Sequence, residues 1–288
     1  MPRPELARPA GDRVKTDARD ALLLARLLRL DEVTPVSVPT ADQEAARDLV
    51  RAREDCRADL MRARHRLSKL LLRHGIVYYG GAAWTGRHDQ WLRHDAFGQL
   101  AVQPTRSAFD ADYDAVLAVT GRRDRLDAEI ERTAAASEFT PLVRRLCCLR
   151  GIATLTGLAL AVEIGDWTRF TGASIGAFTG LVPSEHSSGT SRAQGPITKT
   201  GNGHVRRLLI EAARHHRTRY PISKTLQDRC DLAPAAARAR GDHGNRRLHD
   251  RWLRFIARKK QPTTANAATA RELAGWCWSL AVLDDTAS

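Results

Sequence analysis

Two adjacent serines, Ser187 and Ser188, stand directly before Gly189 in a polar stretch at residues 184–207. A glycine after an exposed serine lets the backbone bring the hydroxyl close to a ligand. Four basic side chains that can bind a phosphate follow in the same stretch: Lys199, His204, Arg206 and Arg207. Such groups would stabilise the charge that develops when a hydroxyl attacks a phosphate. Composition alone instead favours a polar surface loop that leads into a solvated helix start.

Two carboxylates near the N-terminus form a second group with chemical potential. Asp17 and Asp20 are three residues apart at the start of an amphipathic helix predicted over residues 18–30, so both lie on one face of its first turn. Paired carboxylates are hard oxygen ligands for Mg²⁺, which polynucleotidyl transfer requires. The spacing alone favours the simpler explanation that Asp17 is the N-cap and Asp20 faces the helix dipole.

The charge of the chain indicates a polyanionic partner. Its 288 residues carry a formal net charge of +13 with a pI near 10.3, and the surplus comes chiefly from arginine. Because arginine can make two parallel hydrogen bonds to a phosphate, this balance favours nucleic acid over a generically basic protein. A hydrophobic content of 43% is enough for a buried core.

Several classes of site are excluded by composition. The five cysteines are odd in number and form no CxxC pair, which argues against both a zinc site and a disulfide framework. Cys147 and Cys148 are predicted to pack in a core. The chain shows no signal-peptide core, no apolar run long enough for a membrane span, no glycine-rich phosphate loop and no HExxH helix. We therefore expect a cytoplasmic protein without a membrane partner.

Two long helices are predicted to form an antiparallel arm. The first covers residues 41–73 and the second residues 107–137. A heptad seam typical of a coiled coil runs along the first, with Arg53 as its one charged interruption, through Ala46, Leu49, Cys56, Leu60, Ala63, Leu67 and Leu70. The buried face predicted for the second contains Phe109, Tyr113, Val116, Leu117, Leu126 and Ile130. Such an arm suits dimerisation or contact with a partner.

The connection between these helices, residues 75–103, is predicted to be irregular and carries Tyr78, Tyr79, Trp84 and Trp91. These aromatic side chains could stack on unpaired bases, or they could cap the helical hairpin with a small apolar cluster. The residues support both interpretations equally.

The remainder of the chain is predicted to be helical. Residues 141–166 have the outline of a helix-hairpin-helix, whose turn either offers backbone N–H groups to a DNA phosphate or belongs to a buried helical pair. Further helices are predicted over residues 172–180, 204–219, 238–260 and 268–283. The fold class is therefore mainly α, with a long coiled-coil-like arm, a helical C-terminal domain and little or no sheet.

A set of motifs connects these elements to a known family. EIGDWTRF, AFTGLVP, SSG, ITKTGN and HVRRLLIEAA occur in this order between residues 163 and 213, and together they resemble the C-terminal transposase domain of the IS-110/IS-116/IS-902 insertion-sequence family. KTDARDALLLARLLR and the long helix after it resemble the end of the family's N-terminal catalytic domain and its arm. ANAATARELAGWCWSLA resembles its final helix, so the resemblance spans residues 14–283.

The resemblance implies a DNA transposase that is guided by a structured RNA. Its active site would combine an RNase H-like domain, which supplies a DEDD set of acids for Mg²⁺, with a C-terminal serine that becomes covalently attached to DNA. Asp17 and Asp20 match the last two acids, and Ser188 matches the nucleophile. The resemblance thereby reverses the preference for simple capping. Nucleic-acid contacts are expected from Ser187, Lys199, His204, Arg206 and Arg207, and a homo-oligomer, dimer or tetramer, is expected as the assembly.

Three regions follow from this alignment of motifs: residues 1–40 as the end of the RNase H-like domain, 41–138 as the arm, and 139–288 as the transposase domain. Only 16 residues precede Asp17, so the strands and the two leading acids of the family have no counterpart, and we expect an N-terminally truncated copy. Ala153 also departs from the family's usual glycine. The function predicted is DNA transposition; the alternative is a catalytically inactive remnant that binds nucleic acid or dimerises.

Overall fold

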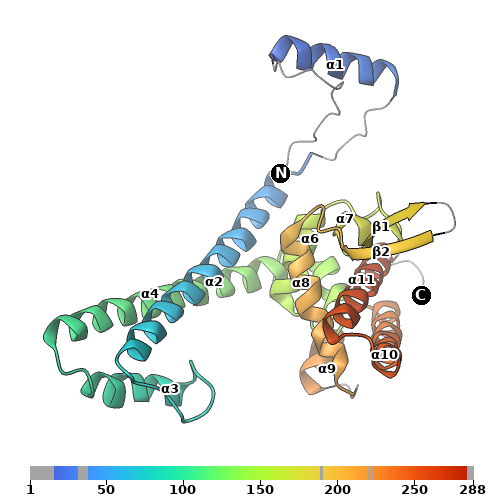
Figure 1. The fold of residues 1–288 in the computed structure, drawn as a ribbon. Helices are drawn as coiled ribbons and strands as arrows, with labels where there is room; N and C mark the ends of the chain where they lie inside the picture. Colours follow the sequence, from blue (N-terminus) through green and yellow to red (C-terminus); the bar gives the residue numbers. More distant parts are fainter. Residues whose placement is uncertain (1–15, 32–37, 189–190, 220, 222, 284–288) are drawn as a thin grey trace. The chain divides into compact units, whose positions relative to one another are not determined.

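The computed structural model describes residues 16–31, 38–188, 191–219, 221 and 223–283. It divides into two compact units, Met1–Pro39 and Thr40–Ser288. The described part is mainly α, as predicted, and its strands form a single antiparallel pair (Figure 1). No helix in these ranges combines the length and the apolar character that a membrane span requires.

The first unit contains helix α1 (Asp17–Arg29), within one residue of its predicted bounds. Its N-cap is Thr16, whose Oγ1 accepts a hydrogen bond from Arg19 N at 3.3 Å. The capping role that the spacing alone favoured for Asp17 is therefore wrong, because Thr16, one position earlier, is the N-cap. Asp17 and Asp20 both lie in the first turn, where a carboxylate interacts favourably with the helix dipole.

The arm begins the second unit. Helix α2 (Ala41–Arg73) has the bounds that the heptad pattern predicted, and Thr40 caps it by accepting from Gln43 N at 3.0 Å. The predicted seam is buried except for Leu49, which is half-buried. Arg53 interrupts the seam, but its charge is paired, because its Nη2 donates to Asp127 Oδ2 on the facing helix at 3.2 Å.

The return helix α4 (Gln103–Ala135) starts four residues earlier than predicted. Pro104 stands in its first turn, where the fixed φ of proline favours helix entry and its missing N–H costs nothing. The prediction that Leu117 is buried was wrong: 44% of it is exposed. Val116 is buried as predicted, and Val119, which was not predicted, is half-buried against the same apolar core of the arm.

The tip of the arm is more regular than predicted. It contains α3 (Gly86–Trp91) and a short π-helix, η1 (Leu92–Ala96). His88 is buried among three aromatic rings, with centroids 4.7 Å from Tyr78, 5.1 Å from Trp84 and 5.5 Å from Trp91. These side chains form the apolar cap that was one of the two interpretations, whereas Tyr79 remains 90% exposed.

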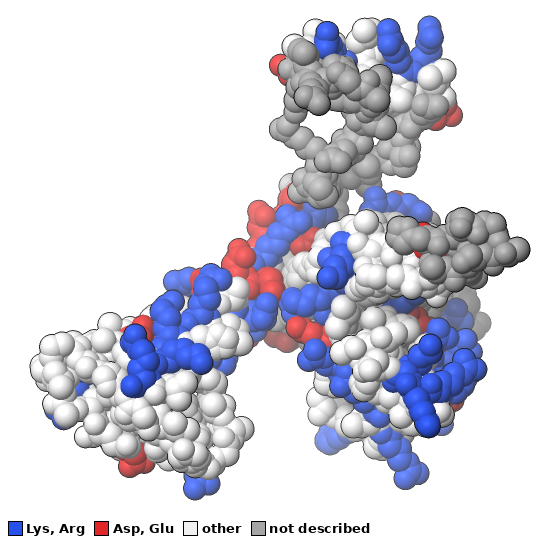
Figure 2. Space-filling view, viewed as in Figure 1, with Lys and Arg blue, Asp and Glu red and all other residues white. Residues whose placement is uncertain are grey.

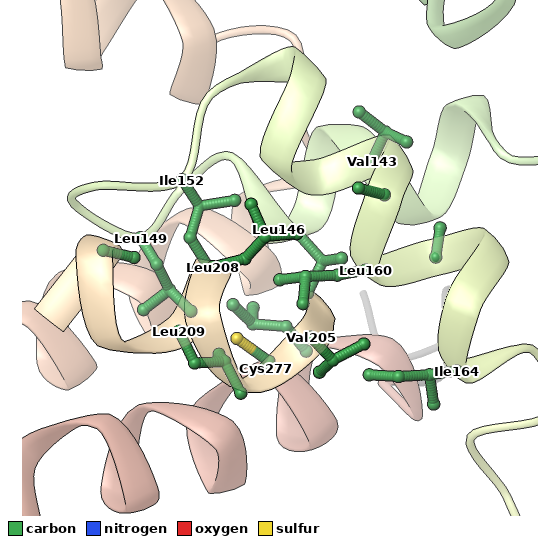
Figure 3. Close-up of a cluster of buried hydrophobic side chains, with 14 of the residues drawn as sticks. Val143, Leu146, Leu149, Ile152, Leu160, Ile164, Val205, Leu208, Leu209 and Cys277 are labelled. Carbon is green, nitrogen blue, oxygen red and sulfur yellow. The ribbon is translucent and has the colours of Figure 1, made fainter. Parts of the chain in front are cut away.

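The rest of the second unit is a helical bundle around α6 (Thr154–Ile164), whose last eight residues are all buried. Its other elements are α5 (Thr140–Leu146), α7 (Ser174–Phe178), α8 (Gly203–Ala213), the 3₁₀-helix η2 (Arg214–Arg217), α9 (Lys224–Cys230), α10 (Ala235–Ala257) and α11 (Pro262–Ala281). Figure 3 shows Leu160 of α6 meeting Leu146, Leu208 and Cys277 from three other segments. Cys147 and Cys148 are buried and unbridged, which confirms core packing.

The turn between α5 and α6 faces the interior. Gly151 has a φ of 81°, and a Cβ there would lie 2.4 Å from the carbonyl oxygen of Ala212. Arg150 N donates to Asn245 Oδ1 at 2.8 Å, so this donor is used by α10. Two helices joined by a short turn are present, and these contacts favour the buried helical pair over a helix-hairpin-helix with an exposed phosphate-binding turn.

The strands β1 (Pro183–Ser188) and β2 (Ser191–Ile197) form a hairpin where a loop was predicted. Ser188 pairs with Ser191, Ser187 with Arg192 and Pro183 with Ile197, with one register shift near Pro183. These strands are polar and lack the alternation of apolar and polar residues that usually predicts a strand. The one signal for a hairpin in the sequence was a two-residue connection that begins with glycine, Gly189.

Candidate active site

The hairpin of β1 and β2, residues 183–197, carries the predicted nucleophile and is called the serine hairpin below. Ser188 is the final residue of β1, and Ser187 precedes it in the same strand. The two-residue connection means that Ser188 stands at the end of the paired ladder. The pairing of β1 with β2 therefore fixes the backbone at Ser188.

The base of the serine hairpin is fixed by a close approach of two backbone segments. Thr198 N donates to Val182 O at 2.9 Å, and Lys199 N donates to Gly180 O at 3.1 Å. Gly180 has a φ of 65°, and a Cβ there would lie 2.2 Å from Thr200 O. A side chain at Gly180 would therefore separate the two segments, which explains a glycine there.

Asn202 connects this base to α8. Its Oδ1 accepts from His204 N at 2.9 Å and from Val205 N at 3.1 Å, so it caps the helix. Its Nδ2 donates to Glu163 Oε2 at 2.8 Å. The Asn202 side chain therefore caps α8 and also bonds the start of this helix to α6.

Glu163 is a buried carboxylate at the centre of an ion-pair cluster, the Glu163 cluster, formed with Arg51, Asn202 and His204. Only 2% of its side chain is exposed. Arg51 Nε lies 2.9 Å from Oε1 and Nη2 lies 3.0 Å from Oε2, while His204 Nδ1 lies 3.4 Å from Oε1. Burial alone would raise the pKa of Glu163, but the hydrogen bonds from His204, Arg51 and Asn202 outweigh it and lower the pKa to about 2.

This cluster joins three elements: the arm through α2, the core through α6, and the serine hairpin through the cap of α8. Sequence reasoning missed Glu163, although a signal was present. It is the one acid in an otherwise apolar helix, and a charge in such a position is retained only with partners.

The basic residues predicted to bind phosphate are divided between two roles. Arg206 Nη1 donates to Thr200 O at 2.9 Å and to Thr179 O at 3.2 Å. Arg207 forms ion pairs with Glu54 of α2 and with Glu211, the latter at 2.8 Å. With His204 in the Glu163 cluster, three of the four are held by intramolecular contacts, and Lys199 is exposed.

The two predicted metal ligands share one turn of α1. Side chains three residues apart on a helix have Cβ atoms about 5–6 Å apart, so Asp17 and Asp20 can bind one ion together. Asp17 is exposed and Asp20 half-buried. Mg²⁺ usually keeps several waters and takes one or two carboxylates together with substrate phosphates, which this donor set fits. Within the described residues, no group of three or more His, Cys, Asp or Glu side chains gathers as a metal site.

Comparisons with known proteins agree with these motifs. A family model described as Transposase IS116/IS110/IS902 family matches residues 143–227, and a second transposase model, of the DEDD type of IS110, matches residues 5–76. The y4qE protein of Sinorhizobium fredii is 35% identical over 277 residues, which cover 96% of this chain and 67% of that protein. The transposase for insertion sequence element IS1533 of Leptospira borgpetersenii is 30% identical over 264 residues, covering 89% and 75%.

These matches do not support the expected N-terminal truncation. They extend over nearly the whole of this chain, and the DEDD-type match begins ahead of Asp17, at residue 5. The segment that contains Asp17 and Asp20 therefore lies within the match to the DEDD-type transposase model.

Proposed function

The chain belongs to the IS116/IS110/IS902 family of transposases, and we propose that it breaks and rejoins DNA with Ser188 as the nucleophile. DNA transposition is the function of this family. The observation that carries the proposal is the position of Ser188 at the end of a hairpin whose base is locked to the helical core. Such a support fixes the backbone that carries the nucleophile, and precise positioning of the reacting groups lowers the barrier to attack.

In the proposed step, the Ser188 hydroxyl oxygen forms a bond to the scissile phosphorus and gives its proton to water. The bond from phosphorus to the leaving sugar oxygen breaks, and that oxygen takes up a proton. The phosphodiester is conserved as a serine–DNA link, so the reverse step can rejoin DNA without a nucleotide cofactor.

Asp17 and Asp20 would hold Mg²⁺, which when bound supplies positive charge to a phosphate and favours attack on it. Lys199 is exposed at the base of the hairpin and can meet a phosphate oxygen directly. Arg206 holds the loop next to Lys199 through Thr200 O, and His204 holds the start of α8 through Glu163. The predicted guide RNA and homo-oligomer belong to the same proposal, with the α2–α4 arm as the element that reaches toward them.

The experiment is to trap the covalent intermediate. Protein, element-end DNA, guide RNA and Mg²⁺ are mixed, and a protein–DNA adduct is sought on a denaturing gel. Ser188→Ala should abolish the adduct, whereas the matched control Ser187→Ala, one position earlier in β1, should retain it. An adduct that survives Ser188→Ala refutes the assignment. DNA binding without any adduct from the unaltered chain would favour the alternative of a protein that binds DNA but does not cut it.

A further inference from the structure

A wide groove lies between the base of the serine hairpin, α10 and α11. Its volume is about 1230 Å³. Pockets for small molecules are usually about 300–1,000 Å³ and enclose most of their ligand. This groove is larger and only partly enclosed, so its shape suits a length of polymer.

The walls of the groove are strongly basic. Five cations line it against a single carboxylate, Glu272, and they are Arg240, Arg247, Arg251, Lys260 and Arg271. Glu272 pairs with Arg247 at 2.8 Å and with Arg251 at 2.7 Å, so one acid serves two arginines. Figure 2 shows blue side chains gathered over α10 in this view. The groove keeps a surplus of positive charge that the protein itself does not neutralise.

The cations of α10 form a stripe along the groove. Arg240, Arg247 and Arg251 recur at spacings of seven and four residues, which places them on one helix face. At 1.5 Å per residue the stripe is about 16 Å long. One DNA strand carries a phosphate about every 3.4 Å along the helix axis, so a stripe of this length spans about five phosphates.

Two tryptophans, Trp276 and Trp278, also line the groove. Gly172 lies against one of them, because a Cβ at this glycine would be 3.4 Å from Trp278. Arg240 lies over the Trp276 ring, 5.6 Å from its centroid. Indole rings beside arginines are the combination that nucleic-acid grooves use to contact sugars and bases.

The groove ends at the serine hairpin. Residues 194–197 of β2 line its edge, and Ile197 is paired with Pro183, which also lines it. Ser188 is five residues from Pro183 along β1, or about 16 Å at the rise of a strand. A polymer that lies in the groove therefore reaches the predicted nucleophile by following the hairpin.

We propose that this groove binds the sugar–phosphate backbone of DNA and leads one strand along the hairpin to Ser188. The inference rests on the proposed function in one respect, that DNA is the polymer. The groove is distinct from the residues at the start of α8, since those arginines are already held by Glu54, Glu211 and two carbonyl oxygens.

The test compares two double variants that remove the same charge. Lys260→Gln with Arg271→Gln removes two exposed cations from the groove, and neither pairs with Glu272. Lys224→Gln with Arg246→Gln removes two exposed cations outside it, at side chains that are 87% and 66% exposed. Binding of a labelled DNA duplex of mixed sequence is measured by fluorescence anisotropy at salt concentrations from about 50 to 200 mM.

The groove variant should bind more weakly and with a shallower salt dependence. Each phosphate contact contributes about 0.9 to the slope of log K against log salt, so losing two contacts lowers the slope by about 1.8. Affinity near 0.1 M salt should fall on the order of 10- to 100-fold. The control variant should stay close to the unaltered protein, since its cations do not touch the polymer.

Acetylation of the unaltered protein provides a second readout. Bound DNA should protect Lys260 from an amine-reactive reagent, measured by mass spectrometry, and should leave Lys224 reactive. Equal losses of DNA affinity in the two variants would overturn the proposal that the groove binds DNA, and so would reaction of Lys260 at saturating DNA. Neither result would contradict the proposed function. The proposal that the groove binds DNA is also wrong if the groove variant loses affinity only for RNA of the same sequence. A wild-type protein without salt-sensitive DNA binding would overturn the proposed function itself.

Discussion

Replacement of Glu163 by glutamine tests the cluster that ties the serine hairpin to the arm. Glutamine keeps the shape of the side chain and resembles the protonated carboxyl, so the change removes one charge and little volume. Arg51 and His204 then lose their anionic partner, while Asn202 retains an acceptor. We expect a large loss of stability at neutral pH and a small one in acid.

The magnitude follows from the pKa of the carboxyl. The pKa of Glu163 falls from 4.5 to about 2 in the folded protein. At about 1.4 kcal/mol per pH unit, this difference corresponds to about 3 kcal/mol of folding free energy at neutral pH. Because 46% of the Arg51 side chain is exposed, the arginine left without its partner can be solvated, and the loss should not exceed this value.

The sign of the pH dependence is fixed by the same difference. The folded pKa lies below the unfolded one, so the unfolded chain binds a proton first as the pH falls. The stabilisation is complete above about pH 5, falls to about 1.4 kcal/mol near pH 3 and is nearly absent at pH 2. The gap between the unaltered protein and Glu163→Gln should close over that range.

Urea unfolding followed by circular dichroism at neutral pH and in steps toward pH 3 measures this gap. Glu211→Gln is the matched control: this carboxylate also pairs with an arginine of the same region, but 51% of its side chain is exposed. An exposed pair contributes about 0–1 kcal/mol, so the control should change stability little. A Glu163→Gln loss below about 1 kcal/mol at neutral pH, or one that does not shrink in acid, would refute the reasoning.

Three further changes test the surroundings of the site. Asn202→Ala removes the cap of α8 and one partner of Glu163, and should cost about 1–2 kcal/mol in the same unfolding assay. Gly201→Ala should expose the serine hairpin to limited proteolysis, because its φ is 71° and a Cβ there would lie 1.9 Å from Phe178 O; Gly86→Ala, with nothing within 4 Å, should not. Leu160→Ala leaves a cavity in the core and should cost about 2–5 kcal/mol, measured by the urea midpoint at unchanged slope.

The elements that the sequence predicted well are those whose signals are local. The start of α2 is set by Thr40, three residues before Gln43. Its buried seam repeats over many turns, so the heptad pattern was sufficient to predict the bounds of the helix. The serine hairpin was missed because it is polar on both strands and owes its form to backbone pairing. The motifs predict where the site lies in the chain, whereas the secondary structure of that segment required the three-dimensional arrangement.

The roles of the basic residues at α8 could not be predicted for a different reason. Arg207 pairs with Glu54, which is 153 residues away in sequence and comes close only after the arm docks on the bundle. Glu163 likewise depends on Arg51, 112 residues away. The sequence shows that such a side chain is charged, but only the folded structure shows which distant residue it pairs with.

The distribution of these partners separates two uses of arginine in this protein. At the start of α8, Arg207 is shared between two carboxylates, and its charge is satisfied by the protein. In the groove between α10 and α11, two arginines share the single carboxylate Glu272, so positive charge remains for a ligand. Salt screens exposed charges far more than buried ones. Added salt should therefore release DNA from the groove before it weakens the contacts that join the arm to the transposase domain.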